Sequence, residues 1–141
     1  MELSEKLSEQ LKALESGLID FKKSLDANMS KYDELEQNWI KNAQVQKFEF
    51  CIELLWKAVK TYFEIEGKTL LTPKLNIKEL YLHQIVEEKQ YLELMKCIES
   101  RNLLSHVYKS ETFELIAADL LSHYNIINTT FGKLKNIFES K

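Results

Sequence analysis

The chain has 141 residues, of which 45% are hydrophobic and 29% charged, a size and balance that predict one domain over residues 1–141 with a single buried core. Only three glycines and one proline are present, and this scarcity of turn-forming residues argues against a many-stranded β fold and favours an all-α one. The formal net charge of -3 excludes a generally basic nucleic-acid-binding surface, so an RNA contact would need a local basic patch.

Leucines at helical spacing predict a long first helix over residues 2–26. The polar stretch 26–33 lacks apolar periodicity and is expected to be a connector. A second helix then runs to Gly67, a residue typical of C-terminal caps. This helix carries more aromatic side chains than one face of a thin bundle needs, so we expect the surplus surface to form a homodimer: Phe48, Phe50, Trp56, Tyr62 and Phe63.

Three more helices are expected in the second half of the chain. Thr72 followed by a proline is typical of a helix start, and a short third helix is expected over 73–86. A fourth helix is expected over 89–104. Ser110 is expected to cap a last helix, unbroken to about Phe138. Four long helices and one short one, joined by brief connectors, predict an antiparallel up-and-down bundle.

The sequence predicts a cytoplasmic protein without membrane contact. It contains no run of about 18 apolar residues, and its first residues alternate charge with leucine instead of forming the apolar block of a signal peptide. Cys51 and Cys97 lie in apolar helical stretches without a CxxC spacing, so both are expected to be free thiols and not metal ligands.

The octapeptide RNLLSHVY, residues 101–108, holds the strongest candidate site. Arg101 is the single arginine among nineteen basic residues, and a guanidinium grips phosphate or carboxylate with a planar fork that lysine lacks. His106 lies five positions later, and residues five apart on a regular helix point about 140° away from each other. The two side chains therefore converge only at a helix end or distortion, or when a second subunit completes the site.

These residue types suit cleavage of RNA without a metal or other cofactor. A neutral imidazole at His106 can take a proton from a ribose 2′-hydroxyl while Arg101 holds the phosphate. Asn102 would orient the phosphate or the imidazole, and Tyr108 would stack on a base or donate a hydrogen bond. Lys96 and Lys109, doubled by a two-fold axis, would add positive charge for a short stretch of RNA.

A second interpretation of the same segment is purely structural. It makes the segment a C-terminal helix cap in which Arg101 pairs with a carboxylate and His106 with a backbone carbonyl.

Other polar groups are interpreted as structural. No histidine has a glutamate three residues before it, which excludes the di-iron pattern of helical bundles. His83 and His123 are interpreted as structural histidines with no assigned role. Glu49 and Glu53 are interpreted as part of a solvated face on which Glu53 pairs with Lys57.

Four blocks of the sequence resemble the HEPN superfamily (higher eukaryotes and prokaryotes nucleotide-binding domains), in its nucleotidyltransferase substrate-binding branch. RNLLSHVY is similar to the Arg-x4-His-x-Tyr signature of that superfamily. The branch also carries segments similar to residues 45–67, to the Thr-Pro helix start and to Glu111-Thr112, and the resemblance covers roughly residues 35–135.

The resemblance implies a dimeric helical bundle that works with a small nucleotidyltransferase encoded nearby. It implies a toxin of a toxin-antitoxin module, acting as a metal-independent endoribonuclease through Arg101, Asn102 and His106. The partner would silence it by transferring AMP to Tyr108, because a bulky anion would occupy the phosphate site beside Arg101. The alternative is a non-catalytic subunit that binds a nucleotide or another substrate for the transferase. The acidic net charge favours this alternative slightly, whereas the intact motif favours the ribonuclease.

Overall fold

The computed structural model describes residues 2–106 and 110–140. Within them the chain forms six α-helices and one 3-10 turn: α1 (Leu3–Leu25), η1 (Met29–Lys31), α2 (Glu34–Ile65), α3 (Pro73–Leu82), α4 (Glu88–His106), α5 (Ser110–Ala118) and α6 (Leu120–Glu139). The described part contains no strand, so the predicted all-α class is confirmed.

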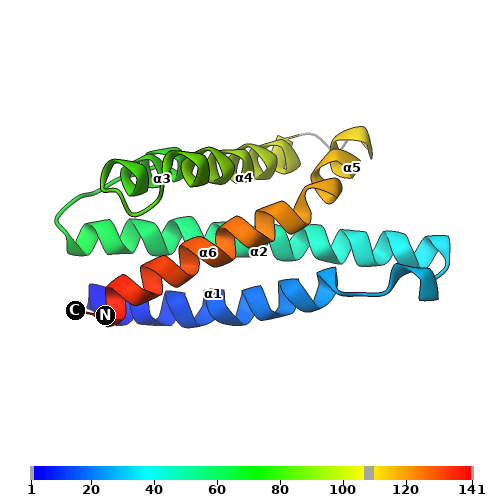
Figure 1. Cartoon of the computed structure of the whole chain (residues 1–141), viewed down its shortest axis with the longest axis horizontal. Helices are drawn as coiled ribbons and strands as arrows, with labels where there is room; N and C mark the ends of the chain where they lie inside the picture. The colour runs from blue at the N-terminus through cyan, green and yellow to red at the C-terminus, as the bar shows by residue number, and fades with distance from the viewer. Residues whose placement is uncertain (1, 107–109, 141) are drawn as a thin grey trace.

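The helices α1 and α2 form a long hairpin and lie side by side in opposite directions (Figure 1). The leucine stripe of α1 is buried from Leu7 to Leu18, as its spacing predicted. The start of α2 is fixed by a capping box in which Asp33 accepts a hydrogen bond from the backbone N–H of Glu36, while the Glu36 carboxylate accepts one from the N–H of Asp33.

The short helix α3 begins as its Thr-Pro start predicted, because the Thr72 hydroxyl accepts a hydrogen bond from the backbone N–H of Leu75 at 3.2 Å. It ends at Leu82, four residues before the expected boundary at 86. The reason is Gln84, whose φ of 60° lies in the left-handed region and cannot continue a right-handed helix.

The prediction of one unbroken last helix is wrong. The chain turns at Asp119, whose N–H bonds to the carbonyl of Ile116 in a tight 3-10 manner, and α5 and α6 run in different directions on either side of it (Figure 1). No proline or glycine marks the turn in the sequence. After it, α6 packs against α1, α2 and α4, whereas α5 stays near the end of α4.

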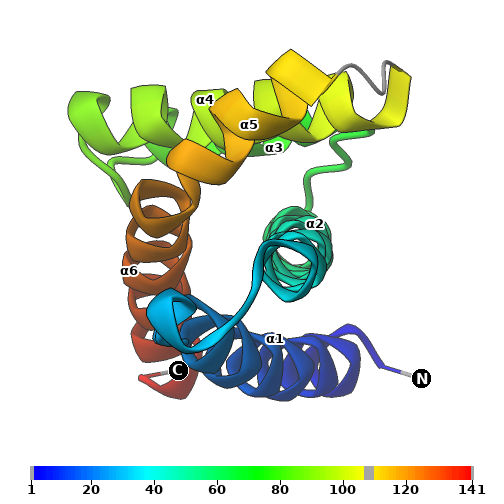
Figure 2. The ribbon, with the colours of Figure 1, turned by 90° about the vertical axis from the view of Figure 1, so that its right-hand side faces the viewer.

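Seen along α2, the helices surround one core, with α3 and α4 on one side, α1 on the opposite side and α6 joining the two (Figure 2). The helices α4 and α6 cross α2 obliquely instead of running parallel to it. The core holds fully buried side chains from five helices: Leu14 and Phe21 from α1, Phe48 and Leu55 from α2, Ile77 and Leu80 from α3, Leu94 and Cys97 from α4, and Ile127 and Leu134 from α6. No helix in the described residues is long and apolar enough to cross a membrane.

Candidate functional site

The predicted site residues that the structure describes lie on α4, most of them near its C-terminal end. Arg101 and Asn102 belong to its last turns and are in direct contact. His106 is the last residue of α4, and its side chain lies outside what the structure describes. Tyr108 and Lys109 lie wholly outside the described residues. Lys96 precedes Arg101 by five positions and lines a pocket between α4 and α6.

The Arg101 guanidinium is held from both sides. Its Nε–H donates to Oε1 of Glu53 on α2, and its Nη1 donates to the side-chain oxygen of Asn102 at 2.9 Å. The Arg101 side chain is 25% exposed, so the group is fixed near the surface and not sealed in the core. A guanidinium has five N–H donors, so a group oriented in this way retains the donor capacity to grip a phosphate.

Glu53 joins this cluster through contacts within α2 as well. Its Oε2 accepts a hydrogen bond from the indole N–H of Trp56 at 3.1 Å and lies 3.9 Å from Nζ of Lys57. The predicted pairing of Glu53 with Lys57 is therefore confirmed, but the bond to Arg101 was missed. No local pattern could have indicated it, since 48 residues separate Glu53 from Arg101.

The structural interpretation of Arg101, in which it pairs with a carboxylate, therefore agrees with this geometry. A second carboxylate, Glu49, lies one turn before Glu53 on α2, and burial raises its pKa above the ordinary value. The positive charge of Arg101 acts in the opposite direction and keeps that rise smaller. Arg101 thus lies next to one bonded carboxylate and within electrostatic reach of another.

His123 on α6 is only 5% exposed and contacts α4 in the turn that precedes Arg101. Its Nδ1 lies 3.3 Å from Sγ of Cys97 and its Nε2 lies 3.1 Å from Oγ of Ser100, both on α4. The imidazole also stacks on the ring of Phe48 from α2, with 4.8 Å between the ring centres. Burial lowers the pKa of His123, so the imidazole is neutral near pH 7, with one nitrogen protonated and the other an acceptor.

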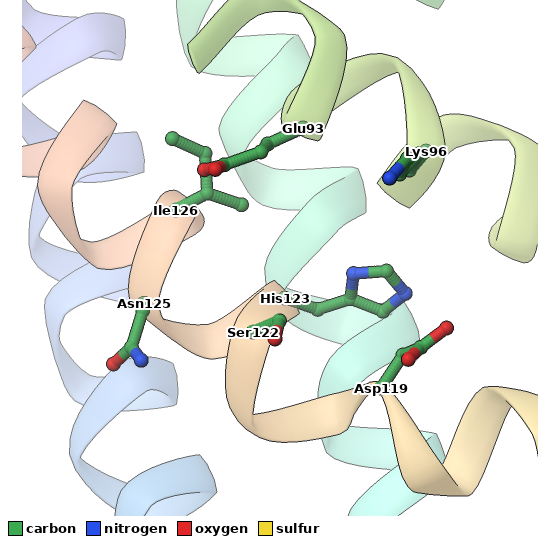
Figure 3. Close-up of a pocket in the computed structure, with 7 residues that line it drawn as sticks. All are labelled: Glu93, Lys96, Asp119, Ser122, His123, Asn125 and Ile126. Atoms are coloured by element: carbon green, nitrogen blue, oxygen red, sulfur yellow. The ribbon is translucent and has the colours of Figure 1, made fainter. Parts of the chain in front are cut away.

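One edge of His123 faces a pocket of about 300 Å³ between α4 and α6 (Figure 3). Apart from one isoleucine the pocket lining is polar: Glu93, Lys96, Asp119, Ser122, His123, Asn125 and Ile126. Asp119 raises and Lys96 lowers the pKa of His123, but both effects are smaller than that of burial. The pocket gives solvent a path to a histidine that is otherwise enclosed.

His83 lies in a different cluster, at the C-terminal end of α3 and against the last turn of α2. Its Nε2 lies 2.9 Å from Oε1 of Glu79, which also accepts a hydrogen bond from the ammonium group of Lys68. The His83 ring packs on Phe63 with 5.2 Å between centres, and its side chain is 46% exposed. The hydrogen bond from Lys68, followed by that from His83, holds the pKa of Glu79 below its ordinary value.

Both histidines have a carboxylate four residues earlier, Glu79 before His83 and Asp119 before His123. This spacing places each pair on one helix face and can be seen in the sequence. In the part of the chain that the structure describes, no three histidine, cysteine, aspartate or glutamate side chains gather in a way that could hold a metal ion.

The model of the family described as "Nucleotidyltransferase substrate binding protein like" matches residues 9–136. A crystal structure of a Thermus thermophilus protein is similar to the chain, with a TM-score of 0.73 and 21% sequence identity over 86% of this chain and 98% of that one. A tri-AMPylated HEPN toxin of Shewanella oneidensis, solved in complex with an MNT antitoxin, is similar with a TM-score of 0.74 and 11% identity over 92% of this chain and 96% of that one. No curated protein matches the sequence.

Proposed function

Because the chain belongs to the family of nucleotidyltransferase substrate-binding-like proteins, we propose that it is the HEPN-type toxin of a two-protein module with a small nucleotidyltransferase. Its activity in this proposal is cleavage of RNA without a metal ion. The observation that carries the proposal is the fixed guanidinium of Arg101, held by Glu53 and Asn102 in the last turns of α4. The HEPN fold shared with a toxin that was solved with its MNT antitoxin supports it.

The proposed reaction is an attack of a ribose 2′-oxygen on the adjacent phosphorus. His106 accepts the proton of the 2′-hydroxyl, the new O–P bond closes a 2′,3′-cyclic phosphate, and the bond to the 5′-oxygen breaks. The leaving 5′-oxygen takes a proton from the imidazolium or from water. Arg101 binds the non-bridging oxygens and stabilises the charge that develops on them, while Asn102 keeps the guanidinium oriented.

A homodimer is part of the proposal. Residues 101 and 106 point to different sides of a regular helix, so two copies related by a two-fold axis would let Arg101 of one and His106 of the other share a phosphate. Of the five aromatic side chains expected to form the homodimer, Phe48 and Phe63 are instead buried in the core, whereas Phe50 is 54% exposed. With Trp39, which is 62% exposed on the same helix, Phe50 supports such an association. Lys96 and Lys109 would then add charge around the shared cleft.

The test of the ribonuclease proposal is cleavage of RNA by the purified protein in EDTA. We expect products with 2′,3′-cyclic ends, and a loss of at least about 100-fold on Arg101→Ala or His106→Ala, the range for removing a group that stabilises or transfers charge in the transition state. Arg101→Lys keeps the charge but lacks the planar fork, so it is expected to lose most of the activity as well. Lys78→Ala, an exposed change on α3, is the control that should cleave normally. Intact RNA after prolonged incubation with the wild type would refute the ribonuclease proposal.

Silencing by the transferase is tested separately by intact-mass measurement after co-expression. We expect the mass of one or more AMP groups on the wild type and none on Tyr108→Phe. A modified protein that still cleaves RNA at the full rate would contradict silencing, because the added anion is proposed to occupy the phosphate site beside Arg101.

A second candidate function is a non-catalytic subunit that binds a nucleotide or another substrate for the transferase. The engagement of Arg101 by Glu53, the nearby Glu49 and the net charge of -3 favour it, because they weaken attraction for a polyanion. Calorimetry with AMP, ATP and the purified transferase distinguishes the two functions. Nucleotide binding without RNA cleavage would support the second candidate, and the absence of affinity for both the nucleotides and the transferase would reject it.

A further inference from the structure

We propose that His123 is a positioning residue for Arg101, holding the turn of α4 from which the guanidinium reaches Glu53. The proposal rests on the proposed function, since in that function Arg101 must be positioned to bind a phosphate. It adds a residue outside the RNLLSHVY motif, on a different helix and 22 positions away in the sequence.

The first argument is the place at which His123 contacts α4. Its two ring nitrogens contact Cys97 and Ser100, and Ser100 immediately precedes Arg101. Cys97 and Ser100 are three residues apart and therefore share a face of the helix about one turn long. A side chain that forms contacts at both ends of this turn restrains α4 from rotating about its axis and from sliding along it.

The second argument is the connection through α2. The imidazole stacks on Phe48, and Arg101 bonds to Glu53, five residues later on the same helix. The histidine and the arginine thus connect α4 to α2 at two points that lie about one and a half turns apart along α2. A small rotation of α4 about its axis would change both contacts together, because the end of a long arginine side chain moves farther than the helix surface from which it starts.

The third argument is that the hydrogen bonds need an imidazole and not merely a ring. A neutral imidazole has one donor and one acceptor, and Ser100 and Cys97 are able to supply the complementary roles. Burial raises the pKa of the Cys97 thiol, which keeps it protonated. A phenylalanine at 123 would fill the space and keep the stacking on Phe48, but it would leave the Ser100 hydroxyl without this partner.

Arg101 is itself the reporter for the test, because a chain with a single arginine gives one Nε–H signal in a ¹⁵N-correlated NMR spectrum. The wild type is expected to show a slowly exchanging Nε–H. His123→Phe should shift the signal and speed exchange about tenfold, the factor that corresponds to loss of a typical hydrogen bond. Ser100→Ala, which removes only one contact and leaves the core filled, should change the signal in the same direction by less. His123→Gln, with a donor and an acceptor on one side chain, should recover part of the wild-type signal.

The control is His83→Phe, which alters a histidine that packs on Phe63, nearer the end of α2 than Glu53. It should leave the Arg101 signal unchanged. A folded His123→Phe protein with a wild-type Arg101 signal would overturn the proposal, and so would an equal change in the His83→Phe control.

The same variants separate this proposal from the ribonuclease proposal. If RNA is cleaved, His123→Phe should lower kcat more than it raises KM, because a misplaced guanidinium loses transition-state stabilisation. If the wild type cleaves no RNA but the Arg101 signal still responds to His123→Phe, positioning stands and the ribonuclease proposal fails.

Discussion

Two histidines of this chain begin from the same local arrangement and end in opposite environments. Each lies four residues after a carboxylate, His83 after Glu79 and His123 after Asp119. His83 bonds to its carboxylate and keeps a side chain that is 46% exposed. His123 instead faces α4, is 5% exposed and bonds to a cysteine and a serine. The exposure of the ring, and not the spacing, decides which partner the histidine takes.

The exposure of the two carboxylates follows the opposite order to that of the histidines. Glu79 is only 7% exposed and accepts bonds from Lys68 and His83, whereas Asp119 is exposed and makes no side-chain bond to cap the start of α6. At one site the acid is buried and its partners lie outward, and at the other the histidine is buried and the acid lies outward. A helix turn with an acid and a histidine four apart thus serves as a hydrogen-bonded anchor or as a core contact, depending on which residue faces inward.

The largest expected effect is on stability when each histidine is truncated. His123→Ala should lower the free energy of unfolding by about 2–4 kcal/mol, because it leaves a cavity beside Phe48 and removes the partner of Ser100. His83→Ala should cost less than about 1 kcal/mol, since the His83 side chain is 46% exposed. Urea unfolding of both variants measures the difference, and equal losses would show that burial does not separate the two sites.

Substitution of the two carboxylates should give the reverse order of stability loss. Glu79→Gln should cost about 1–2 kcal/mol, because the Lys68 ammonium and the His83 ring lose their ionised acceptor in a mostly buried place. Asp119→Asn should change the free energy of unfolding by less than about 0.5 kcal/mol, as expected for an exposed residue. The same urea experiment applies, and a larger loss at Asp119 would contradict the assignment of the buried anchor to Glu79.

Acid should weaken the two sites in different pH windows. Burial lowers the folded-state pKa of His123 below 6.5, so the unfolded chain binds the proton at higher pH and stability falls as the pH drops below about 6.5 toward the folded value. The pKa of Glu79 is held below 4.5, so its contribution is present above about 4.5 and is lost as the pH falls through its folded value. Thermal unfolding over the acid range, from neutral pH downward, should show the first loss reduced in His123→Gln and the second reduced in Glu79→Gln.

The smallest effects concern the pKa of His123 itself. Lys96→Gln should raise it, because the ammonium disfavours a second positive charge nearby, and Asp119→Asn should lower it further. Histidine ring signals followed by NMR through a pH titration measure both shifts. Shifts of the His123 pKa in the same direction in both variants would contradict this assignment.

The sequence predicted most of the fold because periodicity and caps are local. The stripe of α1 and the Thr72 cap appear where they were expected, within one or two residues. The turn at Asp119 was not predictable, because the apolar rhythm continues through it and the change of direction comes from packing against other helices. The left-handed Gln84, which ends α3, also carries no recognisable signal in the sequence, since glutamine is not a residue typical of that conformation.

The candidate site was predicted only in part. The motif indicated Arg101 and Asn102, and the structure brings these two together. Glu53 and His123 were missed as neighbours of the motif because each reaches α4 from another helix, and no spacing in a single sequence records which helix packs on which. The arginine–carboxylate pair belongs equally to the structural interpretation of the segment, and the RNA cleavage assay with Arg101→Ala distinguishes the two interpretations.

The bend between α5 and α6 fixes the rotation of α6 about its own axis as well as its direction. An α-helix turns by about 100° per residue, so one residue inserted after Asp119 would rotate all of α6 by that angle against its neighbours if α5 kept its place. The imidazole would swing away from Ser100, and a side chain next to it would enter the interface with α4. The loss of the contacts of His123 with Cys97 and Ser100 would thus accompany a complete change in which residues α6 presents to the core. The length of this junction is therefore as strict a requirement as the identity of the histidine.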